Sequence, residues 1–310
     1  MTDQIAHEPY FPPDLERLIF RLAAVNSNPD GIRVLMLVAW RVKDWVEPLL
    51  YRAIVIGPFP LGSISSTIPL ITFETFDRVV ELKGRSWLAR TVQHLLLSSL
   101  RPAEITKVLQ ICTGLRRIMV FAVASFHGAL DPVSGLRVFQ GRLSDFFDLA
   151  ALQYQISHRP CLAHLTHAEF LDEVSLSSAD NERLWQDVLL LPSLTHLACS
   201  TNQWNALPSQ MSDHVVAALF PAGGLQVFAL IRYVAGGGSK ELRLGLALRR
   251  HPGFVFLADG IGFWARNWSD GTTMNRSGDY WMQAEDFVQK RIAGTIDKDN
   301  YALYTPHPII

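Results

Sequence analysis

Three histidines and an arginine fall at equivalent places in a recurring apolar pattern and could carry chemistry. They are His94, Arg117, His164 and His196. Because alternate side chains of a strand share one face, the pattern predicts that these four form a column on a common surface. Asp259 is a fifth candidate, since it replaces an apolar residue that should point inward. In an apolar pocket its pKa would be raised, whereas turned toward a helix N-terminus it would be structural only.

Of these residues, Arg117, His164, His196 and Asp259 are the candidate catalytic residues. The chemistry that they suit best is that of a cofactor-independent cyclase, isomerase or lyase, which needs only a shaped cavity and one acid. No motif of a known catalytic class accompanies them. Whether the protein is an enzyme therefore stays open.

The histidines also suggest a metal site as an alternative. Neighbouring strands lie about 5 Å apart, which would bring imidazoles close together. A metal-bound histidine needs a hydrogen-bond partner for its second ring nitrogen, and the sequence identifies none. We therefore expect no metal and no cofactor. His167 occupies an inward position of the pattern and is expected to be a hydrogen-bonded core histidine.

The predicted column depends on a short apolar sequence pattern that recurs along the chain. Residues 194–202 read Leu-Thr-His-Leu-Ala-Cys-Ser-Thr-Asn, which matches the leucine-rich-repeat pattern L-x-x-L-x-C-x-x-N. Such copies at intervals of about 21 to 32 residues predict an α/β fold, an irregular leucine-rich-repeat-like solenoid with parallel strands on the concave face and helices outside. The weaker copies are Val92-x-x-Leu95-x-Leu97, Leu115-x-x-Ile118-x-Val120, Leu136-x-x-Phe139, Leu162-x-x-Leu165-x-His167, Leu225-x-x-Phe228-x-Leu230 and Phe254-x-x-Leu257.

The residues expected on the concave face are apolar for an exposed surface. A face of this kind would not stay bare in a soluble monomer, so a partner peptide, a small molecule or the chain's own aromatic C-terminal loop should cover it. The expected ligand- or partner-binding residues are His94, Arg117, Met119, Phe121, His164, His196, Tyr233, Phe256 and Trp264.

Helices are predicted at both ends of the repeats. Residues 11–22 place proline at a helix start and leucines and isoleucine at the spacing of one helix face, and a second helix is expected over Ile32–Trp45. Ala53–Ile56 should be the first strand. Asp279 can cap a last helix over Tyr280–Ala293. We therefore expect three parts: a helical cap over 1–51, the solenoid over 52–262, and an aromatic loop, capping helix and tail over 263–310.

Composition excludes several classes of partner. The 310 residues carry a formal net charge of -1 without any basic block, which argues against a nucleic-acid surface. Although 49% of residues are hydrophobic, no apolar run is long enough to cross a membrane. Acidic residues and prolines precede the first apolar stretch, unlike in a secretory signal. We expect a cytoplasmic or nuclear protein that binds neither nucleic acid nor membrane.

Three stretches of the N-terminal region resemble the F-box. They are Phe-Pro-Pro-Asp-Leu at 11–15, Ile-Phe-Arg-Leu at 19–22 and Leu-Val-Ala-Trp-Arg-Val-Lys-Asp-Trp at 37–45. The Trp-Val-Glu-Pro-Leu-Leu-Tyr at 45–51 is similar to F-box-like, leucine-rich-repeat-like proteins of mushroom-forming (basidiomycete) fungi. The resemblance implies a substrate receptor of a Skp-cullin-type ubiquitin ligase, which docks on a Skp-type adaptor and holds a protein substrate on the concave face. The adaptor-binding residues would be Pro12, Leu15, Leu18, Ile19, Leu37, Val38 and Trp45.

Two alternatives stay open beside this interpretation. The scaffold could have lost its adaptor and bind or convert a small molecule in a concave apolar pocket. The N-terminal apolar residues could also do no more than close the end of the repeats. Exposure of these residues separates the hypotheses, because a docking F-box must leave an apolar strip free for its partner.

Overall fold

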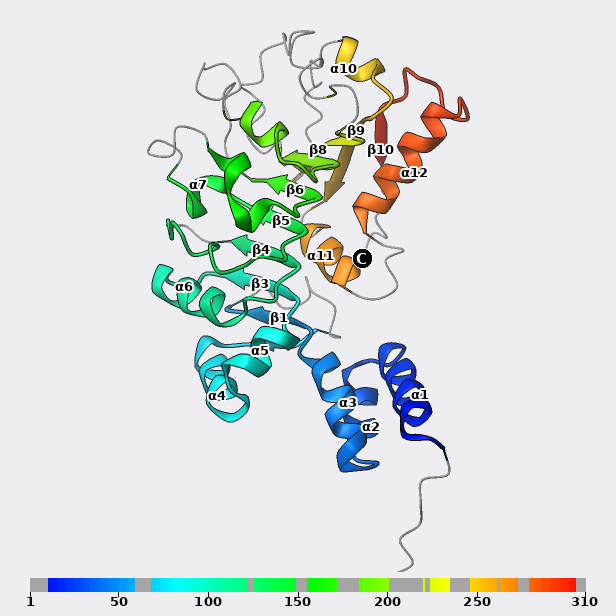
Figure 1. Cartoon of the computed structure of the whole chain (residues 1–310). Coiled ribbons are helices and arrows are strands. Elements are labelled where there is room, and N and C mark those ends of the chain that lie inside the picture. Colours follow the sequence, from blue (N-terminus) through cyan, green and yellow to red (C-terminus); the bar gives the residue numbers. More distant parts are fainter. Residues whose placement is uncertain are drawn as a thin grey trace, which may run out of the picture.

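The chain forms an α/β structure built on one parallel sheet (Figure 1). This computed structural model describes residues 11–58, 68–121, 125–148, 155–171, 184, 186–200, 220, 224–234, 246–260, 263–272 and 279–304. Helices flank the sheet on both faces within these residues, so the predicted α/β class is confirmed. No helix in these ranges is long and apolar enough to cross a membrane.

Ten strands make up the sheet, and every described pair of neighbours is parallel. The order is β10-β9-β8-β7-β6-β5-β4-β3-β1-β2, so from β3 to β10 each strand lies beside its neighbour in sequence. The strands are β1 (Ala53–Ile56), β2 (Leu70–Ile71), β3 (His94–Ser98), β4 (Arg117–Phe121), β5 (Val138–Gly141), β6 (His167–Phe170), β7 (His196–Ser200), β8 (Val227–Val234), β9 (Phe254–Gly260) and β10 (Ala302–Tyr304).

The helices that connect the strands cover one face of the sheet, named here the outer face. Alternate strand residues such as Leu95, Ile118 and Phe139 point to this side and join Phe76 and Leu109 in the main core. Burying each such side chain contributes about 1.5–3 kcal/mol, so this layer fixes the strand register. The connecting helices are α4 (Phe73–Lys83), α5 (Arg85–Thr91), α6 (Pro102–Ile111), α7 (Leu143–Phe146), η1 (Ile156–His158), η2 (Pro160–Leu162) and α10 (Leu246–Arg250).

Two C-terminal helices cover the opposite face, named here the α12 face (Figure 1). In α11 (Phe263–Thr272), Trp268 is buried against Leu96 and Met119. α12 (Tyr280–Ile292) packs Trp281 and Ala284 over the strand residues of β7, β8 and β9. The helix begins as predicted, because the Asp279 side chain accepts a hydrogen bond from the Trp281 backbone N–H at 3.1 Å.

Arg291 fixes the last turn of α12. Its guanidinium donates hydrogen bonds of 2.6 to 3.4 Å to backbone carbonyls of two other segments. The helix expected after the repeats is thus fixed over the strand residues of β7, β8 and β9. The tail that follows it adds β10 to the edge of the sheet, which the sequence pattern did not predict. The five acceptors are Arg249, His251, Pro252, Phe254 and Lys298.

The N-terminal region contains three helices, not two. The expected second helix divides, because Leu37 ends α2 (Pro29–Met36) and Ala39 is extended before α3 (Trp40–Leu50). Together with α1 (Pro13–Val25), these helices bury a small core of their own that includes Ala24 and Val46. A cavity of about 130 Å³ lies between this unit and β1. The predicted strand Ala53–Ile56 is confirmed as β1.

In two strands, the observed register of the apolar pattern differs from the predicted register. The residues of β6 that enter the outer-face core are Ala168 and Phe170, so the pattern there runs Leu165-x-x-Ala168-x-Phe170. In β9 the core residues are Phe254 and Phe256, which pair with Phe228 and Leu230. Both copies are displaced by three residues from the predicted alignment. A shift by an odd number exchanges the two faces of a strand.

Candidate functional site

Three members of the predicted column lie on the α12 face. His94, Arg117 and His196 are all buried there, on β3, β4 and β7. The placement of His164 is wrong: it is exposed in the turn before β6. His167 takes its place and lies beside His196 in the paired strands, so the expectation of a core histidine at 167 is also wrong.

The apolar residues expected on this face divide in the same way. Met119 is buried under Trp268, and Phe121 packs against the same cluster. The placement of Phe256 is wrong, because its side chain belongs to the outer-face core, which is a consequence of the register error in β9. The backbones of Tyr233, Asp259 and Trp264 lie in β8, β9 and α11, but their side chains fall outside the described residues.

Arg117 forms a buried ion pair with the first turn of α12. Its Nη2 donates to Asp279 Oδ2 at 3.0 Å, and both side chains are almost wholly shielded from solvent. Gly271 of α11 lies directly against the guanidinium, since a Cβ there would sit 1.7 Å from Arg117 Nη1. The arginine is therefore committed to holding α11 and α12 on the sheet.

A second buried polar group joins α12 to the middle of the sheet. The carboxylate of Glu169 accepts hydrogen bonds from Gln140 Nε2 at 2.7 Å and from the Tyr280 hydroxyl at 2.9 Å. The Tyr280 backbone N–H donates in turn to Asn267 Oδ1 of α11 at 3.1 Å. A buried carboxylate with such partners stabilises one arrangement of the helices, because removing a single partner would leave a buried polar group unsatisfied.

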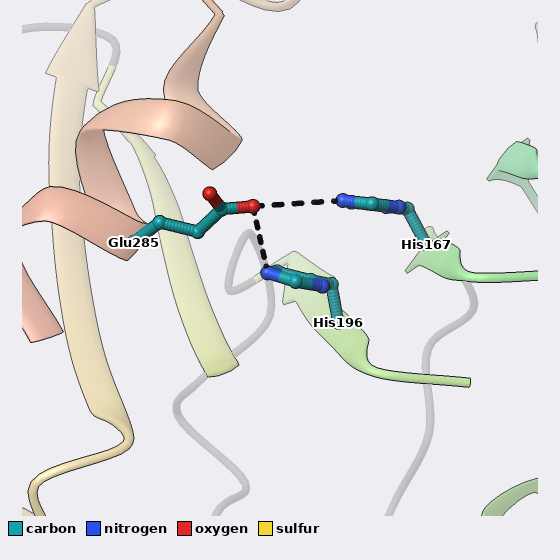
Figure 2. A group of neighbouring side chains, drawn as sticks. All are labelled: His167, His196 and Glu285. Carbon is teal, nitrogen blue, oxygen red and sulfur yellow. Dashed lines mark ion pairs between the residues drawn. The ribbon is translucent and has the colours of Figure 1, made fainter. Parts of the chain in front are cut away.

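The third group consists of His167, His196 and Glu285 (Figure 2). The two imidazoles stack with ring centroids 4.1 Å apart and planes 10° from parallel. Glu285 of α12 approaches them with Oε1 at 3.0 Å from His196 Nε2 and 4.0 Å from His167 Nε2. Trp281 contacts both rings edge-on, with centroid distances of 5.2 and 5.5 Å. The three polar side chains therefore converge at the edge of the helix, with Glu285 46% exposed and His196 5% exposed.

Burial dominates the electrostatics of His196. Together with the neighbouring His167, and against the opposing effect of Glu285, burial lowers the pKa of this imidazole to about 4. His196 is consequently neutral at physiological pH. A neutral imidazole offers one nitrogen lone pair, which can accept a proton or bind a metal ion.

The sequence pattern missed most of the side chains that make up these groups. Glu169, Asp279, Tyr280 and Glu285 were not predicted to lie on the α12 face, since no local pattern shows where α12 packs. One signal for His167 was present in the sequence. The tripeptide Leu-Thr-His occurs at 165–167 and again at 194–196, and aligning these copies gives the observed pairing of β6 with β7.

Comparisons with known proteins do not assign this chain to a family. The sequence matches no protein-family profile and no curated protein.

Proposed function

We propose that the chain is an F-box-like substrate receptor, which docks α1–α3 on the Skp-type adaptor of a cullin ubiquitin ligase. The finer description of the sheet as an irregular leucine-rich-repeat-like solenoid belongs to the same proposal. Both rest on the resemblance in residues 11–51. The observation that carries the proposal is an apolar strip that α1 leaves exposed.

The strip runs along one face of α1. Leu15, Leu18, Ile19 and Leu22 follow the spacing of a helix face, and each is about half exposed, between 49% and 54%. An amphipathic helix of a globular protein normally turns such a face toward the core. Here the opposite side is the one that packs, through the buried Ala24. The arrangement is typical of a helix that awaits an apolar groove in a partner.

The break between α2 and α3 adds further exposed apolar side chains. Leu37 is 86% exposed and Trp40 is 76% exposed, and Val38 lies between them. Trp45 differs from the other predicted adaptor-binding residues, because it packs against the core of the helical unit. Trp45 would therefore hold the three helices together and would not contact the adaptor itself. A bidentate ion pair from Arg41 to Glu16 also joins α3 to α1.

The small-molecule alternative has less support. The side chains expected to line an open concave pocket include Arg117, Met119 and His196, which are buried beneath α11 and α12. The alternative in which the N-terminal helices only close the end of the repeats also has less support. Helices with that role alone would bury the apolar strip. A protein substrate would then bind to surfaces that α11 and α12 leave free.

Co-expression with a fungal Skp-type adaptor tests the proposal. The wild-type chain should elute with the adaptor as a one-to-one complex in size-exclusion chromatography with light scattering. The double variant Leu18→Asp/Ile19→Asp should lose the complex and keep its circular dichroism spectrum, because both side chains are exposed.

Leu82→Asp is the matched control. Leu82 is an exposed leucine of α4, outside the N-terminal helices, and its variant should retain the complex. A wild-type chain that stays monomeric beside the adaptor would refute the receptor proposal. So would a complex that survives the double substitution.

A further inference from the structure

Each Leu-Thr-His tripeptide places a threonine hydroxyl beside Nδ1 of its histidine. Thr166 Oγ1 donates its single hydrogen to the carbonyl of Arg137 at 3.0 Å, and it contacts His167 Nδ1 at 2.8 Å. A hydroxyl that has donated its hydrogen can only accept from the imidazole. The Thr166 hydroxyl is thus a hydrogen-bond partner for His167 Nδ1, and His167 Nε2 faces Glu285.

The same arrangement recurs on the next strand. Thr195 Oγ1 donates to the carbonyl of Thr166 at 3.2 Å and lies 2.8 Å from His196 Nδ1. His196 Nδ1 thus also has a threonine hydroxyl as its partner, and His196 Nε2 faces Glu285. The two threonines provide the partners for the second ring nitrogens that metal-bound histidines require, which the sequence pattern had not identified.

Three electron-pair donors thus face one another on the α12 face. They are Nε2 of His167, Nε2 of His196 and a carboxylate oxygen of Glu285, all within 4.8 Å of one another. His196 Nε2 and Glu285 Oε1 lie 3.0 Å apart as an ion pair, and this buried nitrogen makes no hydrogen bond of good geometry with the described residues. A cation held between these atoms would be attracted by the carboxylate charge and by both nitrogen lone pairs.

We propose that His167, His196 and Glu285 bind a zinc ion. Two imidazoles with one carboxylate are a common three-ligand set for zinc, which takes a water molecule as its fourth ligand. Ligand atoms about 2.1 Å from a tetrahedral zinc lie about 3.4 Å apart, which is between the distances of 3.0 and 4.0 Å from the Glu285 oxygen to the two nitrogens. Because the imidazoles stack within 10° of parallel, one ring must rotate so that both nitrogen lone pairs point at the ion. The half-exposed carboxylate leaves the fourth position open to solvent.

The scaffold brings these three side chains together before any ion binds. Stacking on paired strands sets the distance between the imidazoles, and Trp281 contacts the edges of both rings. Glu285 follows Trp281 by one helical turn, so the packing of α12 also positions the carboxylate. The zinc would join α12 to β6 and β7 and would leave α1–α3 free. The site is thus independent of the proposed adaptor docking.

Zinc titration of the full-length chain tests the proposal. After treatment with EDTA and dialysis, the wild-type chain should bind one zinc ion per chain in isothermal titration calorimetry at neutral pH. Glu285→Gln and His167→Gln should each weaken the affinity by at least about tenfold, the scale on which changes around a metal site act. Cobalt(II) should give the visible absorption of a tetrahedral site, and Glu285→Gln should abolish it.

Two matched controls separate this site from adventitious binding. Asp286→Asn changes the neighbouring carboxylate of α12, which pairs with Lys290, and His164→Gln changes the exposed histidine before β6. Both should bind zinc like the wild type. Equal affinity in wild type and Glu285→Gln would overturn the proposal, as would equal losses in the controls. Because Glu285 is half exposed, its variant should fold, and thermal unfolding without zinc verifies this.

Discussion

Replacing Asp279 by Asn should destabilise the fold by about 3–5 kcal/mol, the usual effect of removing one partner of a buried ion pair. The substitution is selective. Asn remains a good N-cap, so the bond to the Trp281 backbone N–H, worth about 1 kcal/mol, is retained. What is lost is the charge that faces Arg117. Arg117 Nε and Nη1 have no other hydrogen-bond partner among the described residues, so the guanidinium would stay buried without compensation.

A double-mutant cycle with Arg117→Met isolates this effect. When both charges are replaced by uncharged groups, the buried pair is often dispensable, so Arg117→Met/Asp279→Asn should lie within about 1–2 kcal/mol of the wild type. The coupling between the two positions should then amount to at least about 2 kcal/mol. It is measured by urea unfolding monitored by tryptophan fluorescence, with m-values compared between variants.

The exposed ion pair between Arg250 and Asp299 provides the matched control. Its side chains are 52% and 57% exposed at a distance of 2.9 Å, so Asp299→Asn should cost less than about 1 kcal/mol. Single substitutions at Arg117 and Asp279 that add to within about 0.5 kcal/mol would refute the reasoning. In that case the ion pair would not hold α12 on the sheet.

Three further predictions concern Gly271, His251 and Cys112. Gly271→Ala should cost at least about 1–3 kcal/mol in urea unfolding, since its Cβ would overlap the buried guanidinium, while Gly224→Ala, where nothing lies within 4 Å, should be neutral. Burial and the nearby Arg291 lower the pKa of His251, whose stabilising effect is therefore complete above pH about 6.5 and is lost as the pH falls toward the folded-state pKa. Thermal unfolding of His251→Asn should accordingly vary less with pH below about 6.5, and an unchanged pH dependence would contradict this. Burial raises the pKa of the Cys112 thiol to about 12, so iodoacetamide should modify this cysteine only after unfolding, and peptide mass spectrometry would show any early labelling.

The sequence predicts the sheet better than it predicts the site. The apolar pattern located the strands that hold Leu95, Ile118 and Leu197, because burial on the outer face requires apolar residues at alternate positions. It failed in β6, where a further leucine lies three positions before the one that begins the pattern. Leu162 lies in a short 3₁₀ turn and was mistaken for the start of the pattern that Leu165 begins.

The approach of α12 could not be predicted in the same way. The helix itself was found from its cap at Asp279 and its length, which are local properties. Its position on the sheet depends on contacts such as Tyr280 with Glu169, separated by 111 residues in the chain. A single sequence contains no periodic signal for contacts of this kind. The division of the second N-terminal helix at Leu37 was missed because the residues around it are apolar and suit a helix equally well.

The two Leu-Thr-His tripeptides are 29 residues apart and occupy matching positions of neighbouring strands. When a unit of this kind is duplicated, the copy brings both a histidine and the threonine that orients it. A binding surface can therefore widen by one strand at a time, without any new arrangement of the backbone. On the next strand, Val227 pairs with His196. Gln226 and Val227 are therefore the positions at which a third threonine and histidine would extend the row of stacked rings.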